Sequence, residues 1–384
     1  MSLCKSIDEI NQKIKSGSAV VLTADEFKNL SEKHSPAELV EKVDVVTTAT
    51  FGPMCSSGAF INFGHPETPI RMEKISLNGV PVCAGVAAVD AYIGATEESA
   101  NKKNYGGAHV IEDLIAGKSV ELIASAKGTD CYPRKEVRTF ITKDDVNEFT
   151  MFNPRNAYQN YPCAINSSDS LIYTYMGTLL PNLGNATYST AGEISPLIND
   201  PNMRTIGVGT KIFLGGAQGF IAWRGTQFNT TKPRNESDIP KSNAATLAVI
   251  GDAKEMSSEY IKAACYTNYG VSIFVGIGIP IPVIDEDIAQ RLSIRNNQIT
   301  TTIFDYSQAS KPALGEVTYD QLQSGNIELD GKKIRTAPMS SLNKARKIAT
   351  ELKQEIEAGE FTLTIPVQAL PQNSSMNSLK IKGA

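Results

Sequence analysis

Val43-Asp44-Val45-Val46-Thr47-Thr48-Ala49-Thr50-Phe51 is the stretch that decides the fold of this chain. Six of its nine residues are β-branched, and such a run predicts a strand. Gly52-Pro53 ends the run, and a loop of small and polar residues follows at 54–59. This composition lets backbone amides approach a ligand. Because the loop contains Cys55, the predicted strand delivers a thiol to a place where a ligand can bind.

A second strand and loop repeat this arrangement. The apolar positions of residues 108–116 have helical spacing, and Gly117 stands where a C-terminal cap is expected. Residues 120–126 then predict a strand that runs into the segment 127–135, which contains Cys131 and is called the Cys131 loop below. Both thiols therefore lie in loops entered from the C-terminal end of a strand, where open α/β sheets usually place reacting groups.

Caps and periodicity predict the remaining elements. A Ser-Pro-x-Glu start predicts a helix at 35–41, and residues 341–358 form the most regular helical repeat of the chain. Residues 271–284 are apolar and β-branched, which predicts a buried strand, and Asp285 can open a helix after it. An Asp-Gly pair within 327–334 predicts a hairpin.

These elements predict a mixed α/β fold of the α+β kind. We expect a central mixed sheet with helices, and a Gly-rich, β-containing middle region at about 158–243. Residues 1–370 are expected to form a single domain with room for two lobes. The polar residues 371–384 are expected to form a disordered tail.

Composition bounds the classes of function. The 384 residues include 37 Lys and Arg against 41 Asp and Glu, a net charge of −4, so nucleic acid is not expected as a partner. Charged residues precede any apolar run at the N-terminus, and no stretch approaches the roughly 18 apolar residues of a membrane span. We therefore expect a cytoplasmic protein without a membrane partner.

Several sequence patterns of known metal and nucleotide sites are nearly present, but the spacing of their residues does not match. The six cysteines contain no C-x-x-C pair, so no zinc or iron–sulfur site is indicated and free thiols are expected. Gly207-x-Gly209 and Gly276-x-Gly278 each lack the third glycine of a dinucleotide site, and close strand packing is their expected role. Gly117-Lys118-Ser119 has Glu112 where a P-loop needs its first glycine.

The residues next to Cys131 in the sequence favour sulfur chemistry at this cysteine. Such chemistry requires a thiolate, and nearby cations favour its formation. Arg134 and Lys135 follow Cys131, and Asp130 beside it can take or supply a proton. Isolated cysteines are nevertheless often small buried apolar residues, and Cys83, in an apolar run, is assigned to the core on that ground.

Cys55 is a candidate nucleophile on similar grounds, since Ser56 and Ser57 flank it. His65 follows closely enough to share its pocket, and His109 lies at the start of the helix predicted at 108–116. Either histidine is a candidate acid or base. A capping or packing role is the alternative for both.

Longer strings carry a resemblance to a known family, from about residue 35 to residue 370. They are Thr50-Phe51-Gly52-Pro53-Met54-Cys55-Ser56-Ser57-Gly58-Ala59, Asn62-Phe63-Gly64-His65, Leu77-Asn78-Gly79-Val80-Pro81, Asp90-x-Tyr92-Ile93-Gly94-Ala95-Thr96, Tyr105-Gly106-Gly107-x-His109-Val110-Ile111-Glu112-Asp113, Gly128-Thr129-Asp130-Cys131-Tyr132-Pro133-Arg134-Lys135, Phe213-Leu214-Gly215-Gly216-Ala217 and Gly225-Thr226-Gln227. Through them the chain resembles the homocysteine biosynthesis family of anaerobes and methanogens, the L-aspartate semialdehyde sulfurtransferases.

The resemblance implies conversion of L-aspartate semialdehyde to L-homocysteine, on a route to methionine, with sulfide-level sulfur and two electrons. It also implies that Cys131 carries a persulfide and that Cys55 is a second essential thiol. Cys55 can resolve the persulfide through a transient disulfide if the two sulfurs reach bonding distance.

Roles for the other candidates follow from that chemistry. Arg134 or Lys135 is expected to hold the substrate carboxylate, and His65 or His109 to protonate the departing oxygen. The expected substrate site is completed by Ser56, Ser57 and Asp130.

The resemblance also implies a separate small iron–sulfur protein of the ferredoxin kind, because some members of the family work with one. Since the chain has no cluster-binding cysteine spacing, electrons are expected from such an external donor, and sulfur from sulfide or a persulfide donor. A homo-oligomer is left open. Two other function classes remain, a non-catalytic sulfane-sulfur carrier or metabolite-binding protein, and a thiol-dependent enzyme that acts on acyl groups or aldehydes without sulfur transfer.

Overall fold

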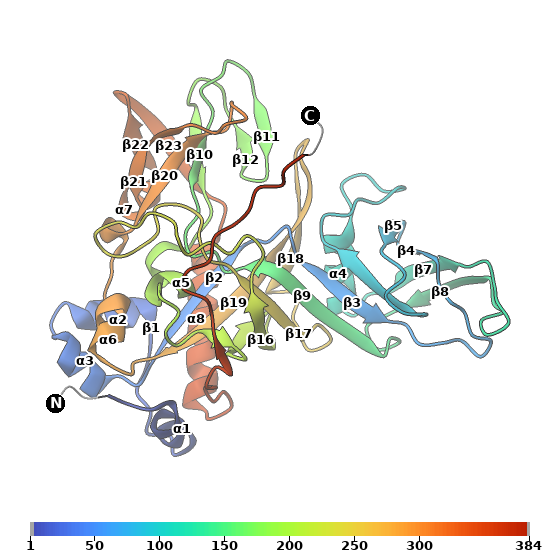
Figure 1. The fold of residues 1–384 in the computed structure, drawn as a ribbon, viewed down its shortest axis with the longest axis horizontal. Coiled ribbons are helices and arrows are strands. Elements are labelled where there is room, and N and C mark those ends of the chain that lie inside the picture. The colour runs from blue at the N-terminus through green and yellow to red at the C-terminus, as the bar shows by residue number, and fades with distance from the viewer. Residues whose placement is uncertain (1–3, 382–384) are drawn as a thin grey trace.

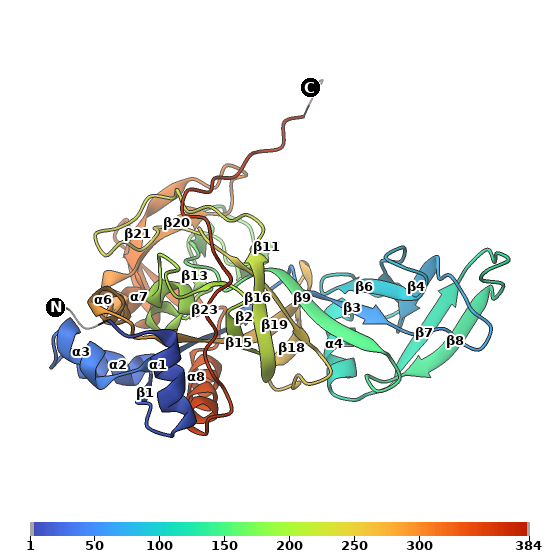
Figure 2. The same ribbon diagram turned by 60° about the horizontal axis from the view of Figure 1, so that its bottom comes forward.

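The computed structural model describes residues 4–381 and consists of a body and a narrower lobe (Figure 1, Figure 2). The body contains most of a ten-stranded sheet, a six-stranded sheet and the N-terminal helices. The lobe, on the right in both views, carries a four-stranded sheet and helix α4 (Gly107–Ile115). The mixed α/β class predicted from the sequence is confirmed.

The ten-stranded sheet is built around the stretch quoted first. Strand β2 (Val45–Pro53) is buried at every residue but the last, and it pairs antiparallel along its whole length with β19 (Gly270–Pro282). The other strands of this sheet are β1 (Val21–Thr23), β15 (Lys211–Leu214), β16 (Ala217–Arg224), β17 (Leu247–Asp252), β9 (Glu148–Asn156), β3 (Gly58–Asn62), β6 (Asp90–Gly94) and β18 (Ile261–Tyr266).

Helix α8 (Leu342–Glu357) packs on β2 and β19, where two glycines make room for it. A Cβ atom added to Gly278 would lie 3.1 Å from side-chain atoms of Ile348 and Leu352, so the predicted close packing at Gly276-x-Gly278 is confirmed. The same apolar core is covered by α1 (Ile7–Lys15), α2 (Ala24–Ser31), α3 (Pro36–Lys42) and α6 (Glu286–Leu292).

The six-stranded sheet has the order β21-β20-β10-β13-β23-β22. Its strands are β10 (Cys163–Ile165), β13 (Asn185–Tyr188), β20 (Thr300–Asp305), β21 (Ala313–Thr318), β22 (Asn326–Leu329) and β23 (Lys332–Pro338). Asp330 and Gly331 make the predicted hairpin turn, with φ of 50° and 72°. The smaller elements around it are β11 (Ile172–Thr174), β12 (Gly177–Leu179), α5 (Pro196–Asn199), α7 (Tyr319–Gln323) and the 3-10 segments Gly192–Ile194 and Asn296–Gln298.

The lobe is a rigid extension of the ten-stranded sheet. Its own sheet has the order β5-β4-β7-β8, from β4 (Lys74–Leu77), β5 (Val80–Val82), β7 (Val120–Ser125) and β8 (Glu136–Ile141). One hydrophobic cluster runs from the lobe into the body and includes Val110, Leu122 and Ile277. Rigid-body movement of the lobe would therefore break a continuous core.

Strands β2 and β7, which lead into the two cysteine loops, lie in different sheets. One expectation requires correction. Cys83 is exposed rather than in the core, because it lies just beyond the edge strand β5.

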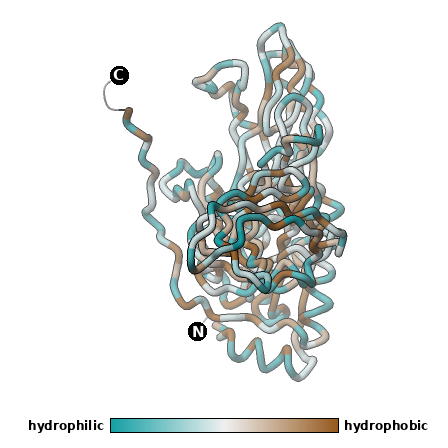
Figure 3. Tube along the Cα trace, turned by 90° about the vertical axis from the view of Figure 1, so that its right-hand side faces the viewer, coloured by the Kyte–Doolittle hydropathy of each residue, from teal (hydrophilic) through white to brown (hydrophobic). Residues whose placement is uncertain are grey.

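The C-terminal segment pairs with the body and then leaves it. Strand β24 (Gln368–Ala369) pairs with β14 (Gly207–Val208), and Thr230 exchanges backbone and side-chain hydrogen bonds with Ser374. The last described residues extend away from the body (Figure 3). Within residues 4–381, no helix has the length and apolar character that crossing a membrane requires.

Candidate functional site

Strand β19 sets the position of Cys55, which lies in the connection between β2 and β3. The backbone N–H of Met54 donates to the carbonyl of Ile273 at 2.7 Å and ties this connection to β19. The Cys55 side chain is half-buried, and its Sγ lies 3.2 Å from Oγ of Ser272, a fully buried residue of the same strand. The thiol therefore has a fixed polar neighbour.

The thiol opens onto a cavity of about 230 Å³, called the Cys55 cavity below. Drug-sized ligands usually occupy roughly 300–1,000 Å³, so this volume suits a smaller metabolite. The polar residues of its lining include Cys55, Ser56, Arg155 and Gln227. The aromatic residues, called the tyrosine group, are Tyr158, Tyr161, Tyr175 and Tyr269.

Arg155 is the one charged residue among those that line the cavity. It lies near the end of β9, and its carbonyl accepts a hydrogen bond from Oγ of Ser56 at 3.2 Å. Its Nε is buried and has no hydrogen-bond partner among residues 4–381, and no carboxylate of those residues forms an ion pair with it. A buried donor without a partner calls for an explanation, and an absent ligand is one.

Two lining segments hold unusual backbone. Ala157, between Arg155 and Tyr158, has φ of 48°, and Gln227 has φ of 61°. Residues other than glycine seldom adopt this region, and such strain clusters at functional sites. The N–H of Ala157 is held by Oδ1 of Asn156 at 2.9 Å.

The tyrosine group forms a chain of aromatic contacts. The rings of Tyr158 and Tyr161 meet edge to face at 4.8 Å, and Tyr175 lies 6.3 Å from Tyr161 and 6.2 Å from Tyr269. Burial raises the pKa values of Tyr158, Tyr161 and Tyr269, and the neighbouring Cys55 adds to the rise for the first and last of these. These three hydroxyls are therefore uncharged at neutral pH.

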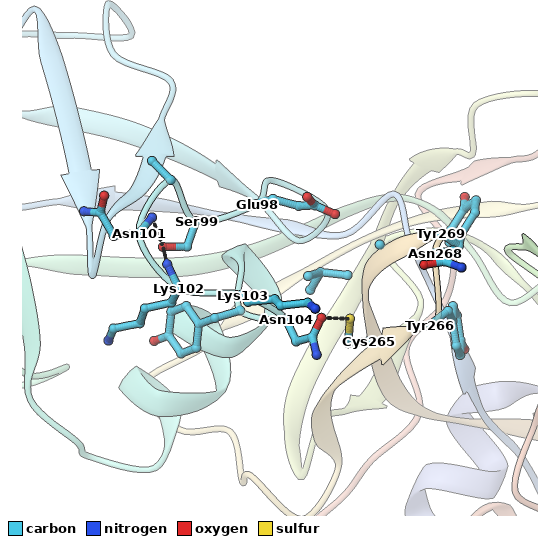
Figure 4. A pocket seen from close by; sticks show the side chains of 14 residues that line it. Glu98, Ser99, Asn101, Lys102, Lys103, Asn104, Cys265, Tyr266, Asn268 and Tyr269 are labelled. Atoms are coloured by element: carbon cyan, nitrogen blue, oxygen red, sulfur yellow. Dashed lines mark hydrogen bonds between the residues drawn. The ribbon is translucent and has the colours of Figure 1, made fainter.

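A larger cleft of about 580 Å³ shares Tyr269 with the Cys55 cavity. Figure 4 shows the side chains that line this cleft. It lies between loop 98–105 of the lobe and the turn between β18 and β19. Lys102 and Lys103 line its lobe side, and the thiol of Cys265 lies 3.6 Å from Oδ1 of Asn104. The cleft gives the Cys55 cavity an open, polar approach.

Cys131 lies in a different environment, on the connection between β7 and β8. Its side chain is exposed, and none of the cavities described above includes it. The loop is ordered by paired backbone hydrogen bonds between Thr129 and Tyr132, and Nε of Arg134 donates to the carbonyl of Thr68. An exposed thiol on an ordered loop is accessible to another molecule.

Strand β3 separates the two thiols within one chain. Cys55 precedes its first residue, whereas the Cys131 loop contacts His65 and Thr68, which follow its last residue. Five residues of strand span about 13 Å between the first and last Cα. Because β3 pairs with β6 and β9 over all five residues, this separation is held by two ladders. The structure thus does not bring the two cysteines together.

The predicted histidines also lie apart from Cys55. His65 is exposed and its ring stacks on Tyr132 with centroids 5.6 Å apart, so it neighbours the Cys131 loop and does not share the Cys55 cavity. Nδ1 of His109 accepts a hydrogen bond from the N–H of Gly106 at 3.2 Å, and its ring stacks on Tyr105. Burial lowers the pKa of His109. Its geometry is that of the capping alternative.

Each of the other predicted site residues lies near one of the two cysteines. Ser56 lines the Cys55 cavity, whereas Ser57 is buried and bonded to Met54 and Asn153. Three lie on the Cys131 loop, where Lys135 crosses over Gly128, Asp130 is exposed and Arg134 is partly exposed.

The sequence reasoning missed Arg155, the tyrosine group, Gln227 and Ser272. They come from four separate segments, 155–161, 175, 227 and 269–272, and only Gln227 stood in a string that carried the resemblance. The density of tyrosine between 158 and 175 is a signal that was available.

Comparison with known proteins gives one consistent result. The family described as "Homocysteine biosynthesis enzyme, sulfur-incorporation" matches residues 19–363. The chain is 49% identical over 379 residues to a protein of Methanosarcina acetivorans named L-aspartate semialdehyde sulfurtransferase, covering 98% of this chain and 74% of that protein. It is 48% identical over 396 residues to a protein of the same name from Methanocaldococcus jannaschii, covering 98% and 75%. No solved structure matches the chain significantly.

Proposed function

The chain belongs to the family of homocysteine biosynthesis enzymes that incorporate sulfur, and on this basis we propose that it is an L-aspartate semialdehyde sulfurtransferase that makes L-homocysteine. The observation that carries the proposal is the Cys55 cavity, in which a half-buried thiol faces a space of metabolite size with one partly buried cation, Arg155, in its wall. We assign the semialdehyde to this cavity.

We assign a second task to Cys131, the acceptance of sulfur from its donor. Its exposure on an ordered loop suits a thiol that must meet a donor molecule and carry a persulfide. Lys127, Arg134 and Lys135 place positive charge on the same loop.

The chemistry balances as follows. The terminal sulfur of the Cys131 persulfide bonds to the aldehyde carbon, and the carbonyl oxygen takes a proton. The thiolate of Cys55 then attacks the sulfur of Cys131, the old sulfur–sulfur bond breaks, and a hydroxythiol and a Cys55–Cys131 disulfide result. Loss of water leaves a thioaldehyde. Two electrons and two protons reduce it to homocysteine. When the sulfur source is sulfide, the disulfide is the oxidant of the loading step: sulfide attacks the sulfur of Cys131, Cys55 leaves as the thiolate, and the Cys131 persulfide forms again. The net requirement is then the two electrons that reduce the thioaldehyde. When the source is a persulfide donor, two further electrons and two protons first reduce the disulfide, and the donor then transfers its outer sulfur to Cys131.

The two thiols meet, in this proposal, between two copies of the chain. Within one copy Cys55 lines its cavity, whereas Cys131 lies on an exposed loop outside that cavity, and the two form no disulfide, which would need Cα atoms within about 7 Å. The 580 Å³ cleft beside the Cys55 cavity offers the approach for the Cys131 loop of a second copy.

Electrons come from an external donor in this proposal. A small iron–sulfur protein of the ferredoxin kind is the donor we propose. All six cysteines are free thiols, which is consistent with action in the reducing cytoplasm.

Homocysteine formation by cysteine variants tests the proposal. The wild type, supplied with semialdehyde, a sulfur donor and a chemical reductant, is expected to make homocysteine, and Cys55→Ala and Cys131→Ala to lose activity by at least about a hundredfold. Cys83→Ala, which removes an exposed cysteine outside both sites, is the matched control and is expected to retain activity.

Peptide mass spectrometry distinguishes the proposed enzyme from a non-catalytic carrier of sulfane sulfur. The Cys131 peptide is expected to gain the mass of one sulfur atom after incubation with the donor, and this gain should persist in Cys55→Ala. Persulfide on Cys131 without any homocysteine would establish the carrier alternative. Full homocysteine formation by Cys131→Ala would remove Cys131 from the reaction.

A further inference from the structure

The lining of the Cys55 cavity carries a positive charge and no negative charge. Arg155 supplies the one charged side chain of the lining, and no carboxylate among the described residues pairs with it. An arginine that is partly buried without a counter-ion is expected to receive one from a ligand, and a carboxylate matches its forked donors. The cavity therefore favours an anionic group beside Arg155.

The tyrosine group favours a cation. Its four rings line the cavity, and ring faces attract ammonium groups. One of these rings, that of Tyr175, already lies beside a cation. Nζ of Lys311 lies 5.4 Å from the ring centroid of Tyr175 and 4.3 Å from that of Tyr306.

The volume limits how far apart the two charges can be. A cavity of about 230 Å³ admits a small molecule that carries both groups within a few bonds, and Cys55 borders the same space. A free α-amino acid with a short reactive side chain meets these three conditions.

We propose that the Cys55 cavity recognises its substrate as a free α-amino acid, with Arg155 binding the α-carboxylate and the tyrosine group surrounding the α-ammonium. This inference rests on the proposed function, since it specifies how the same cavity selects its aldehyde. Recognition at the two charged groups leaves the aldehyde carbon free to face Cys55.

Three aldehydes of matched length test the inference on the wild-type protein. L-Aspartate semialdehyde carries both charged groups, 4-oxobutanoate lacks the ammonium, and 3-aminopropanal lacks the carboxylate. We expect kcat/KM for thiol formation to fall by roughly 10- to 100-fold without the carboxylate and by roughly two- to thirtyfold without the ammonium. Equal kcat/KM for all three would overturn the inference, while a wild type that makes no thiol from any aldehyde would instead overturn the proposed function.

Variants locate the two contacts. Arg155→Met should raise KM for the semialdehyde by roughly 10- to 100-fold, with kcat changed much less, and should have no further effect on 3-aminopropanal. Arg155→Lys should recover part of the loss. Arg335→Met, at an exposed position on β23, is the matched control and should leave KM unchanged.

Tyr161→Leu should lower kcat/KM for the semialdehyde more than for 4-oxobutanoate, and Tyr161→Phe, which keeps the ring, should recover most of the loss seen in Tyr161→Leu. An Arg155→Met effect of the same size on 3-aminopropanal would show that Arg155 does not bind the carboxylate. Thermal unfolding of each variant shows whether it has folded.

Discussion

The sulfur of Cys55 lies beside a buried hydroxyl and faces the tyrosine group, while the sulfur of Cys131 faces solvent. Both cysteines follow a strand, and their local sequence context is similar. Their surroundings differ because the two strands belong to different sheets. This explains why both thiols were found from sequence while Arg155 and the tyrosine group were not. The latter come together only through contacts between distant segments.

Lys28 gives a prediction at the scale of one residue. Its side chain is fully buried, and Nζ donates to Oδ1 of Asn199 at 3.0 Å and to the carbonyl of Leu292 at 2.7 Å. Burial lowers its pKa to about 7. Between that value and 10.5 the unfolded chain binds more protons, so stability should rise with pH in this window.

Chemical denaturation from pH 7 to pH 10 measures this effect. Relative to Lys28→Met, the wild type should gain up to about 1.4 kcal/mol per pH unit in unfolding free energy. Lys33→Met, at an exposed position of the same region, should follow the wild type. Parallel pH curves for wild type and Lys28→Met would show that the buried amine keeps its ordinary pKa.

Several elements were predictable because their signals are local. The N-caps Ser35, Asp285 and Ser341 each bond within four residues, and Gly117 and Gly359 adopt positive φ where helices end. The same logic would have found α1 and α2, which begin with the capping boxes Ser6-x-x-Glu9 and Thr23-x-x-Glu26. Which strands share a sheet was not predictable, because pairings such as β2 with β19 join residues more than 200 positions apart.

Gly278 gives a prediction at the scale of an element. Ala at this position would bring a methyl group within 3.1 Å of Ile348 and Leu352 and push α8 away from β19. Gly278→Ala should destabilise the protein by about 1–3 kcal/mol in chemical denaturation. Gly94→Ala is the control, since nothing lies within 4 Å of its added Cβ, and it should stay within about 0.5 kcal/mol of wild type. An undisturbed Gly278→Ala would mean that α8 is not tightly packed there.

The whole molecule combines a fixed cavity with a distant, exposed thiol. The Cys55 cavity is lined by residues of the body. The Cys131 loop connects β7 and β8, which lie in the lobe (Figure 1). A continuous sheet and one apolar core join the two parts, so closure within one chain would break the ladders of β3. We therefore propose that sulfur loaded on Cys131 of one copy reaches the Cys55 cavity of another.

Subunit complementation tests this claim most directly. Cys55→Ala retains Cys131, and Cys131→Ala retains Cys55, so a mixed dimer of the two holds one complete site of the two that a symmetric dimer has. Co-expressed with different tags and purified by both, the mixed dimer is predicted to make homocysteine at about half the wild-type rate, although each variant alone is inactive. A mixed dimer as inactive as its parents would contradict delivery between chains and place both thiols of each reaction in one copy.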